Sequence, residues 1–239
     1  MAKWVLGVLI ASTIWCFPDS CTSNGSATAQ IVYIKTETMP EVVGPMRPPR
    51  QILEFVARNP EFADRAAKSR KIQRLVYDEK LAQTLDRINR EGNKIKWTSD
   101  RQVWGVDEIW DFPCLSNGEL YDDCDGIAIW KMNELMNAGI SASVLLLSKG
   151  YTETNEGHLV LVVTTDKGDF VLDNRFPDVK RADDLIAFGY LFQYRPASGD
   201  DLTGPWVEYK KTRLPPLFVP GDRGPDLIPM CTPKPLPNR

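Results

Sequence analysis

Three residues of this 239-residue chain have side chains that could together carry out nucleophilic chemistry: Cys124, His158 and Asp173. His158 is the only histidine in the chain, so a zinc site built on two or three histidines is excluded. A cysteine activated by a histidine, which is in turn oriented by a carboxylate, can attack a carbonyl carbon. We therefore predict a thiol hydrolase with Cys124 as nucleophile, His158 as general acid and base, and Asp173 as the orienting group.

Cys124 stands where a helix is expected to begin, with Asp122 or Asp123 as its cap and Gly139 at its end. The unpaired N–H groups of a helix N-terminus favour a thiolate. The flanking aspartates, Asp125 among them, oppose a thiolate by like charge, which a histidinium partner would offset. The alternative for Cys124 is an inert thiol that packs in the core as a small hydrophobe.

His158 and Asp173 lie in two segments that are expected to form a β-hairpin. Residues 158–164 and 169–173 are strand-like, and the turn between them includes Asp166, Lys167 and Gly168. A two-residue turn makes the sum of opposed residue numbers odd, which puts His158 and Asp173 on one face of neighbouring strands. Both faces are apolar, so we expect the hairpin to be central in a sheet. The alternatives are a structural histidine and a turn aspartate.

The other elements complete an α+β layout in which the nucleophile helix packs on an antiparallel sheet. We expect helices over 51–59 and 78–90, and strands over 143–149 and 206–209. Residues 96–120 are interpreted as a loop packed by its aromatic side chains, and the segment after Tyr190 as irregular.

The chain divides into three parts. Residues 1–29 resemble a signal peptide, with a positive start, a short apolar run and Ala27-Thr28-Ala29 before a cleavage point; the alternatives are an uncleaved anchor or a mobile N-terminus. Residues 30–210 are expected to form one catalytic domain. Residues 211–239 are rich in proline and are expected to be extended or disordered. These features predict a periplasmic or secreted protein without a stable membrane anchor.

Signal cleavage leaves three cysteines, so at least one thiol is unpaired. If Cys124 is the free one, Cys114 and Cys231 can form a disulfide that ties the proline-rich tail to the aromatic loop. The net charge of −3, with no basic stripe, makes nucleic acid an unexpected partner.

Several segments resemble the bacterial transglutaminase-like cysteine proteinases of the papain-like superfamily. They are Asp123-Cys124-Asp125, residues 156–158 with the apolar run that follows, and residues 168–174; 55–61 and 104–110 match more loosely. The resemblance covers roughly residues 50–209. It implies a papain/transglutaminase-like fold and a cysteine peptidase that hydrolyses a peptide bond of a protein or peptide substrate through an acyl-enzyme.

The resemblance also implies a possible calcium site at Asp123 and Asp125. The family usually carries a further acidic residue where this chain has Gly126, and two carboxylates are few for an ion that takes six to eight oxygens. The alternative roles are helix capping by Asp123 and a favourable first-turn charge from Asp125. The hydrolytic chemistry itself requires no cofactor.

Two other functions remain open. An amidase or acyltransferase would use the same triad, because the substrate pocket decides between these reactions. A non-catalytic envelope protein could keep the fold and bind a partner. The Cys124 backbone N–H is expected to form half of an oxyanion hole, while the second donor and the oligomeric state are not determined by the sequence.

Overall fold

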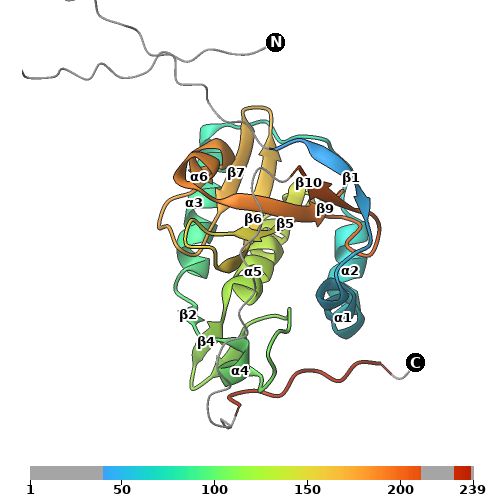
Figure 1. The fold of residues 1–239 in the computed structure, drawn as a ribbon, viewed down its shortest axis with the longest axis vertical. Coiled ribbons are helices and arrows are strands. Elements are labelled where there is room, and N and C mark those ends of the chain that lie inside the picture. The colour runs from blue at the N-terminus through green and yellow to red at the C-terminus, as the bar shows by residue number, and fades with distance from the viewer. Residues whose placement is uncertain (1–39, 211–228, 238–239) are drawn as a thin grey trace, which may run out of the picture. The chain divides into compact units, whose positions relative to one another are not determined.

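The structure, a computed structural model, describes residues 40–210 and 229–237 (Figure 1). The signal-like segment and most of the proline-rich tail lie outside the described residues. Within the described ranges, one sheet has the strand order β1-β10-β9-β5-β6-β7-β8, and a small second sheet has the order β2-β4-β3. Every pairing in the larger sheet is antiparallel, which confirms the predicted α+β class.

The larger sheet is built from β1 (Val42–Met46), β5 (Leu145–Tyr151), β6 (Gly157–Thr165), β7 (Gly168–Leu172), β8 (Lys180–Arg181), β9 (Leu191–Pro196) and β10 (Trp206–Tyr209). The smaller sheet is built from β2 (Lys96–Trp97), β3 (Cys114–Ser116) and β4 (Glu119–Asp122). The helices are α1 (Arg50–Arg58), α2 (Pro60–Ala67), α3 (Glu79–Gly92), α4 (Asp100–Val103), α5 (Cys124–Asn137) and α6 (Ala182–Phe188), with a 3-10 turn over Ala142–Val144.

The β6–β7 hairpin lies in the interior of the larger sheet, between β5 and β8. Thr165 pairs with Gly168 across a two-residue turn, and Val162 pairs with Val171. The opposed residue numbers therefore have the odd sum that the sequence predicts. Leu161 packs into the larger hydrophobic core and Val162 into a second core on the other face, so the hairpin is buried on both sides as predicted.

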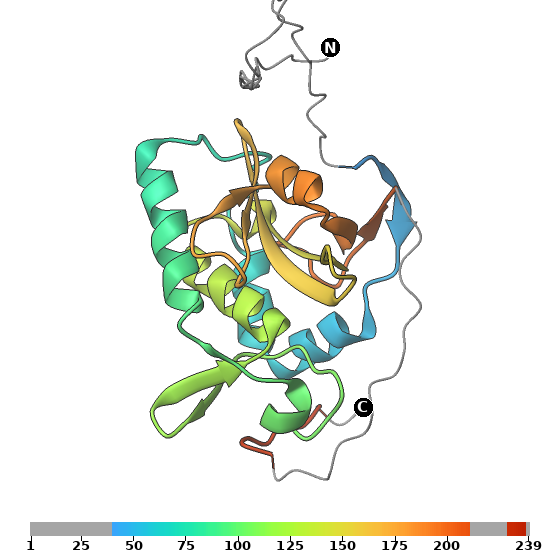
Figure 2. The same ribbon diagram turned by 60° about the vertical axis from the view of Figure 1, so that its left-hand side comes forward.

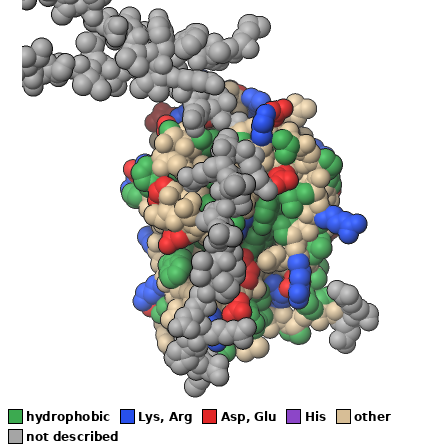
Figure 3. Space-filling view, in the orientation of Figure 1, with side chains coloured by type: hydrophobic (Ala, Val, Ile, Leu, Met, Phe, Trp, Pro, Cys, Tyr) green, Lys and Arg blue, Asp and Glu red, His purple; other side chains and the backbone are tan. Residues whose placement is uncertain are grey.

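Helices cover the two faces of this sheet unequally (Figure 2). Side chains of α1, α2, α3 and α5 form the main core with one face, and α6 covers part of the other. In the described ranges, no helix has the length and hydropathy needed to cross a membrane. On the face shown in Figure 3, Lys and Arg side chains are scattered singly among Asp and Glu.

Local capping places the start of α5 at the cysteine. Asp123 is the N-cap, and its carboxylate accepts a hydrogen bond from Asp125 N at 3.1 Å. Of the two candidate caps, Asp123 therefore has this role and Asp122 ends β4. In α3, the predicted cap Asp78 likewise accepts from Leu81 N at 2.7 Å. Both caps follow from short acidic side chains before an apolar stripe.

Two sequence interpretations are wrong. Residues 96–120 are not only a loop, because they contain α4 and the strands of the smaller sheet. These elements have two to four residues each, too few for a periodic pattern to reveal. The segment after Tyr190 is not irregular, because it contains β9, which pairs with both β5 and β10. Its conformation depends on pairing with both neighbours in the sheet, of which β5 is remote in sequence and β10 is the next strand along the chain.

The described part of the C-terminal tail is bonded to the domain. Cys114 and Cys231 form the predicted disulfide, with Cα atoms 6.1 Å apart and a sequence separation of 117 residues. Backbone N–H groups of Met230 and Cys231 donate to the carbonyl oxygens of Gln102 and Val103, at 3.2 and 2.8 Å. The tail segment therefore lies against α4 and closes a long loop, which restricts the unfolded chain.

Candidate active site

His158 and Asp173 meet directly at the end of the sheet. Their Nε2 and Oδ1 atoms are 2.9 Å apart, and both side chains are buried. His158 is the second residue of β6, and Asp173 directly follows β7, so the hairpin register places them on adjacent strands. Because the carboxylate accepts, Nε2 carries a proton and Nδ1 of the neutral imidazole is the basic nitrogen.

Arg175 fixes the Asp173 carboxylate from the other side. Its backbone N–H donates to Oδ1 at 2.9 Å, and its guanidinium donates to Oδ2 at 2.8 Å through Nη2 and at 3.1 Å through Nε. The same guanidinium donates to Glu153 at 2.9 Å. Sequence reasoning missed Arg175, although its position two residues after Asp173 offered a signal for a local turn contact.

These contacts keep Asp173 ionised in a buried place. Burial alone would raise the pKa of this carboxyl, but the hydrogen bond and charge of His158 and the bonds from Arg175 outweigh burial and hold the pKa below the usual value of 3.8. An ionised carboxylate can hold one tautomer of the imidazole and stabilise an imidazolium.

Gly150 on the adjacent strand β5, and Tyr190 directly before β9, support His158. Tyr190 donates its hydroxyl to the His158 carbonyl oxygen at 3.0 Å, and the two rings meet edge to face. Gly150 pairs with His158 across β5 and β6. A Cβ at position 150 would lie 2.4 Å from the Leu191 carbonyl oxygen and 2.6 Å from the Tyr190 ring. The site therefore requires glycine opposite the histidine.

Cys124 is the first residue of α5, and its sulfur lies beside the strand that carries His158. Leu159 N donates to Cys124 Sγ at 3.5 Å, and Cys124 is the free cysteine of the described residues. Within these residues no hydrogen bond joins the thiol to the imidazole, whose Nδ1 remains without a partner. His158 and Asp173 are thus directly hydrogen-bonded, and Cys124 is hydrogen-bonded to Leu159, the residue next to His158.

Lys149 is a cation on the same side of the sheet as the thiol. It pairs with Leu159 across β5 and β6, and its Nζ lies 4.0 Å from Glu108 Oε1. Burial and the Asp123 carboxylate raise the pKa of the Cys124 thiol to about 12, while the charge of Lys149 acts against this rise. Sequence reasoning did not single out Lys149, because a lysine at the end of an apolar strand has no local signature.

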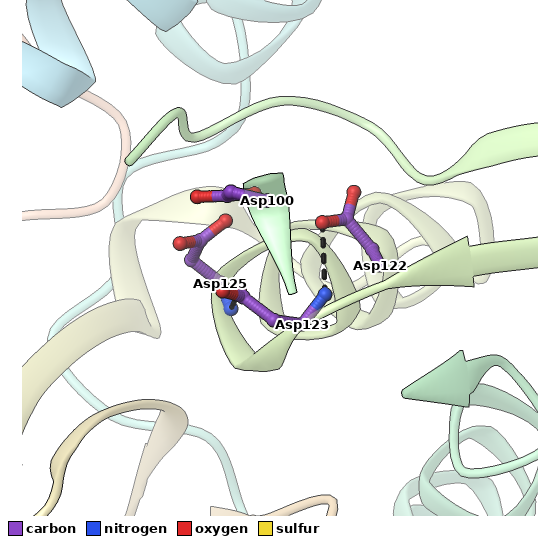
Figure 4. A group of neighbouring side chains, drawn as sticks. All are labelled: Asp100, Asp122, Asp123 and Asp125. Carbon is purple, nitrogen blue, oxygen red and sulfur yellow. Dashed lines mark hydrogen bonds between the residues drawn. The ribbon is translucent and has the colours of Figure 1, made fainter. Parts of the chain in front are cut away.

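Four aspartates gather at the start of α5 (Figure 4). One carboxylate oxygen from each lies within 4.8 Å of the others; the residues are Asp100, Asp122, Asp123 and Asp125. The sequence singled out the last two as possible metal ligands. It could not find Asp100, which comes from α4 and reaches the group only through the tertiary fold.

The cluster has the character of a cation site. Three of its buried oxygens have no hydrogen-bond partner: Asp100 Oδ1, Asp122 Oδ2 and Asp125 Oδ1. Burial and neighbouring carboxylates raise the pKa of Asp100 to about 8 and that of Asp122 to about 9. Carboxylate oxygens are the ligands that calcium prefers, so the residues present fit this ion.

Gly126 leaves room for the Asp122 carboxylate in the cluster. A Cβ there would lie 2.2 Å from Asp122 Oδ2 and 2.3 Å from its Cγ. The Asp122 carboxylate therefore occupies the space over the first turn of α5. A carboxylate from β4 takes the place that a side chain at position 126 would need.

Comparisons with known proteins give a family match. A family model described as bacterial transglutaminase-like cysteine proteinase matches residues 42–213. The solved structure of calcium-bound LapG from Legionella pneumophila is 18% identical, with a TM-score of 0.41, over 66% of this chain and 84% of that chain. The EGTA-treated form is 19% identical, with a TM-score of 0.43, over 70% and 90%. No curated protein matches the sequence significantly.

The Asp173 contacts predict a pH-dependent effect on stability. Because its pKa is lowered on folding, the carboxylate stabilises the folded state fully above pH 3.8, and this contribution is lost as the pH falls through the folded-state value. Asp173→Asn should lower the free energy of unfolding at pH 7 by about 3 kcal/mol. The difference from wild type should narrow at pH 3, as measured by urea unfolding at both pH values.

The matched control for this measurement is Asp178→Asn, at an exposed aspartate paired with Arg90. It should change stability little at either pH. An Asp173→Asn difference that is the same at pH 7 and pH 3 would show that the charge of Asp173 contributes nothing.

Proposed function

Because the chain belongs to the bacterial transglutaminase-like cysteine proteinases, a family of cysteine peptidases, we propose that it cleaves peptide bonds with Cys124, His158 and Asp173 as its triad. The observation that carries the proposal is that the two nitrogens of the His158 imidazole have different surroundings. Nε2 is bonded to Asp173, which leaves Nδ1 for the thiol, and the N–H of Leu159 reaches the Cys124 sulfur. These contacts support the assignment of a nucleophile, a base and an orienting group, the three roles that acyl transfer needs.

In the first half-reaction, His158 Nδ1 takes the proton of the Cys124 thiol as the sulfur attacks the scissile carbonyl carbon. The resulting imidazolium is stabilised by Asp173 through Nε2. The carbon–nitrogen bond then breaks, and the leaving amine receives the proton from Nδ1. The acyl group remains on Cys124 as a thioester.

In the second half-reaction, His158 Nδ1 takes a proton from a water molecule, which attacks the thioester. The carbon–sulfur bond breaks, the new carboxylic acid leaves, and the proton returns to Cys124. The Cys124 backbone N–H is a donor for the oxyanion, because the first residue of a helix has no intrahelical acceptor for its N–H.

The family supports a protein substrate. An amidase or acyltransferase would use the same groups, and a non-catalytic envelope protein would leave them idle. No contact in the described residues favours either alternative. Cleavage of a polypeptide by the wild-type chain separates peptidase activity from both.

We also propose that the four aspartates bind calcium. Asp100, Asp122 and Asp125 each contribute an oxygen that lacks a hydrogen-bond partner, and Asp123 offers a carboxylate oxygen beside them. Bound calcium would neutralise this negative charge and link α4, β4 and the start of α5. This arrangement has a structural consequence for Cys124, since the helix on which it lies begins within the cluster.

We further propose that the chain is exported and cleaved after Ala29. The support lies in the three-part pattern of residues 1–29 and in the disulfide, since structural disulfides are typical of oxidising compartments. Cleavage would leave Cys124 as the single free thiol beside the Cys114–Cys231 pair.

The triad predicts the effects of three substitutions on cleavage. Cys124→Ala and His158→Ala should each reduce polypeptide cleavage by about a thousandfold or more, because members of a triad act as a unit. Asp173→Asn should cost about 10- to 100-fold, because an amide oxygen can still accept from Nε2 but carries no charge. The measurement compares new N-termini in envelope proteins treated with each variant.

Iodoacetamide labelling provides the control for folding and access. The oxidised mature chain, cleaved after Ala29, should incorporate one label, at Cys124, and the same chain with Cys124→Ala should incorporate none. Full cleavage activity in Cys124→Ala would refute the mechanism, and an inert Cys124 in a folded wild type would favour the non-catalytic alternative.

The proposed calcium site predicts that one substitution, Asp100→Asn, has opposite effects on stability in EDTA and in calcium. Asp100→Asn should raise the free energy of unfolding in EDTA at pH 7, by about 1 kcal/mol, because folding raises the pKa of Asp100 by burial and by nearby carboxylates, a cost that the neutral amide does not bear. It should reduce the rise in melting temperature that calcium produces in wild type. Differential scanning calorimetry with EDTA, calcium or magnesium measures both effects, and Asp86→Asn, at an exposed ion pair, is the control.

An identical melting temperature of wild type in calcium and in EDTA would reject the calcium proposal. Calcium binding with unchanged strength in Asp100→Asn, measured by calorimetric titration, would place the ion elsewhere. Neither result would affect the triad.

Export predicts the mass of the mature protein. The protein recovered from the cell envelope should begin at Gln30 and should contain a Cys114–Cys231 linkage, both of which non-reducing mass spectrometry detects. Retention of residues 1–29 in the envelope fraction would support an uncleaved anchor. Alkylation of Cys114 and Cys231 without reductant would show that the pair is not formed there.

A further inference from the structure

Lys131 is a buried cation that the proposed chemistry does not use. Its side chain is 0% exposed, and it lies on α5, about two helical turns after Cys124. Its ammonium donates to Asn89 Oδ1 at 2.8 Å and to Asn93 Oδ1 at 2.7 Å. Both acceptors are neutral amide oxygens, so the contacts do not form an ion pair.

The two asparagines connect the lysine to the segment that follows Asp173. Asn89 Nδ2 donates to the carbonyl oxygens of Phe176 and Pro177, at 3.1 and 3.2 Å. Asn93 Nδ2 donates to the Phe176 carbonyl oxygen at 2.8 Å. Because each amide nitrogen serves these carbonyls, each amide oxygen faces Lys131, and an ammonium with several N–H groups can satisfy both.

The Phe176 segment is bonded in turn to Asp173. Phe176 N donates to the Asp173 carbonyl oxygen at 3.3 Å, and Arg175 N donates to its carboxylate at 2.9 Å. Lys131 is therefore connected through Asn89 and Asn93 to the Phe176 backbone, which is itself hydrogen-bonded to Asp173, the partner of His158.

The Lys131 side chain fits closely between α5 and α3. A Cβ at Gly92 would lie 2.7 Å from Lys131 Cε and 2.8 Å from Cγ, so α3 approaches α5 closely only because position 92 is glycine. Burial lowers the pKa of Lys131 to about 7, and the charge of Asp173 acts against this fall. The lysine is thus held in the interior at a cost that a hydrophobic residue would avoid.

We propose that Lys131 is a positioning residue that holds segment 173–177 through Asn89 and Asn93, so that the Asp173 carboxylate meets His158 Nε2. This inference rests on the proposed triad for its functional meaning. The alternative is that Lys131 only fills space between α3 and α5, a role that methionine of similar length would serve equally well.

The sole histidine makes the test direct, because imidazole signals in a ¹⁵N–¹H spectrum can come only from His158. In wild type, Nε2–H should give a hydrogen-bonded signal that is protected from exchange with water. In Lys131→Met, the Nε2–H proton should exchange about tenfold faster, and its shift should move away from that of a carboxylate-bonded proton. The measurement requires no substrate, so its result is independent of whether the chain hydrolyses peptides.

Two further variants keep the test decisive. Asn93→Ala removes one acceptor of Lys131 and one bond to Phe176 while Asn89 remains, and it should show the same change to a smaller extent. Leu135→Ala removes buried volume from α5 and leaves the polar network intact, so its Nε2–H signal should match wild type. If Lys131→Met does not fold, Asn93→Ala and Leu135→Ala decide the question.

An unchanged Nε2–H signal in folded Lys131→Met would overturn the proposal and leave Lys131 a packing residue. The same faster exchange in Leu135→Ala would also overturn it, because the effect would then follow general destabilisation. Loss of cleavage in the triad variants together with an unchanged signal in Lys131→Met would refute this inference and retain the proposed function.

Discussion

A carboxylate with 1% of its surface exposed, as Asp173 has, must be paired or must take up a proton. Here His158 donates from one side and Arg175 from the other, and the group remains ionised. The hairpin register, the turn after β7 and the hydroxyl of Tyr190 all place these groups around one carboxylate. The orientation of the imidazole, and the identity of Nδ1 as its basic nitrogen, follow from this single buried charge.

At the start of α5, by contrast, groups of like charge are brought together. Four carboxylates converge where α5 begins, and several of their oxygens have no partner in the described part of the chain. Burial and mutual repulsion raise the pKa of these acids, and the thiol beside them shares the effect. The calcium ion that we propose would reduce this repulsion, because the aspartates come from three elements that meet there. Lys149 supplies one positive charge from the sheet, although it is paired with Glu108.

The site is therefore a junction of elements that each bring one type of group. α5 presents the sulfur, β6 the imidazole, and the turn after β7 the carboxylate. α3 contributes no group that could react, yet Asn89 on this helix and Asn93 at its C-cap hold the backbone beyond Asp173. Lys131 links this support to α5, so the helix that begins at Cys124 is also connected to the segment that follows Asp173.

The sequence by itself determined the residues whose chemistry is local. The scarcity of histidine singled out His158, the cap at Asp123 located the start of α5, and a two-residue turn with apolar strands predicted the register that brings His158 to Asp173. The pairing of Cys114 with Cys231 followed from counting cysteines. These inferences succeed because caps, turns and strand alternation depend on neighbours in the chain.

Only the tertiary structure decided which distant groups complete the site. Asp100 joins the acidic cluster from α4, Lys131 reaches two asparagines 42 and 38 residues away, and β9 forms only between its two partner strands. None of these has a local pattern, because a buried charge or a short strand is stabilised by whatever group the fold brings to it. The physical reason is that burial, which makes an unpaired charge costly, exists only once the elements have packed.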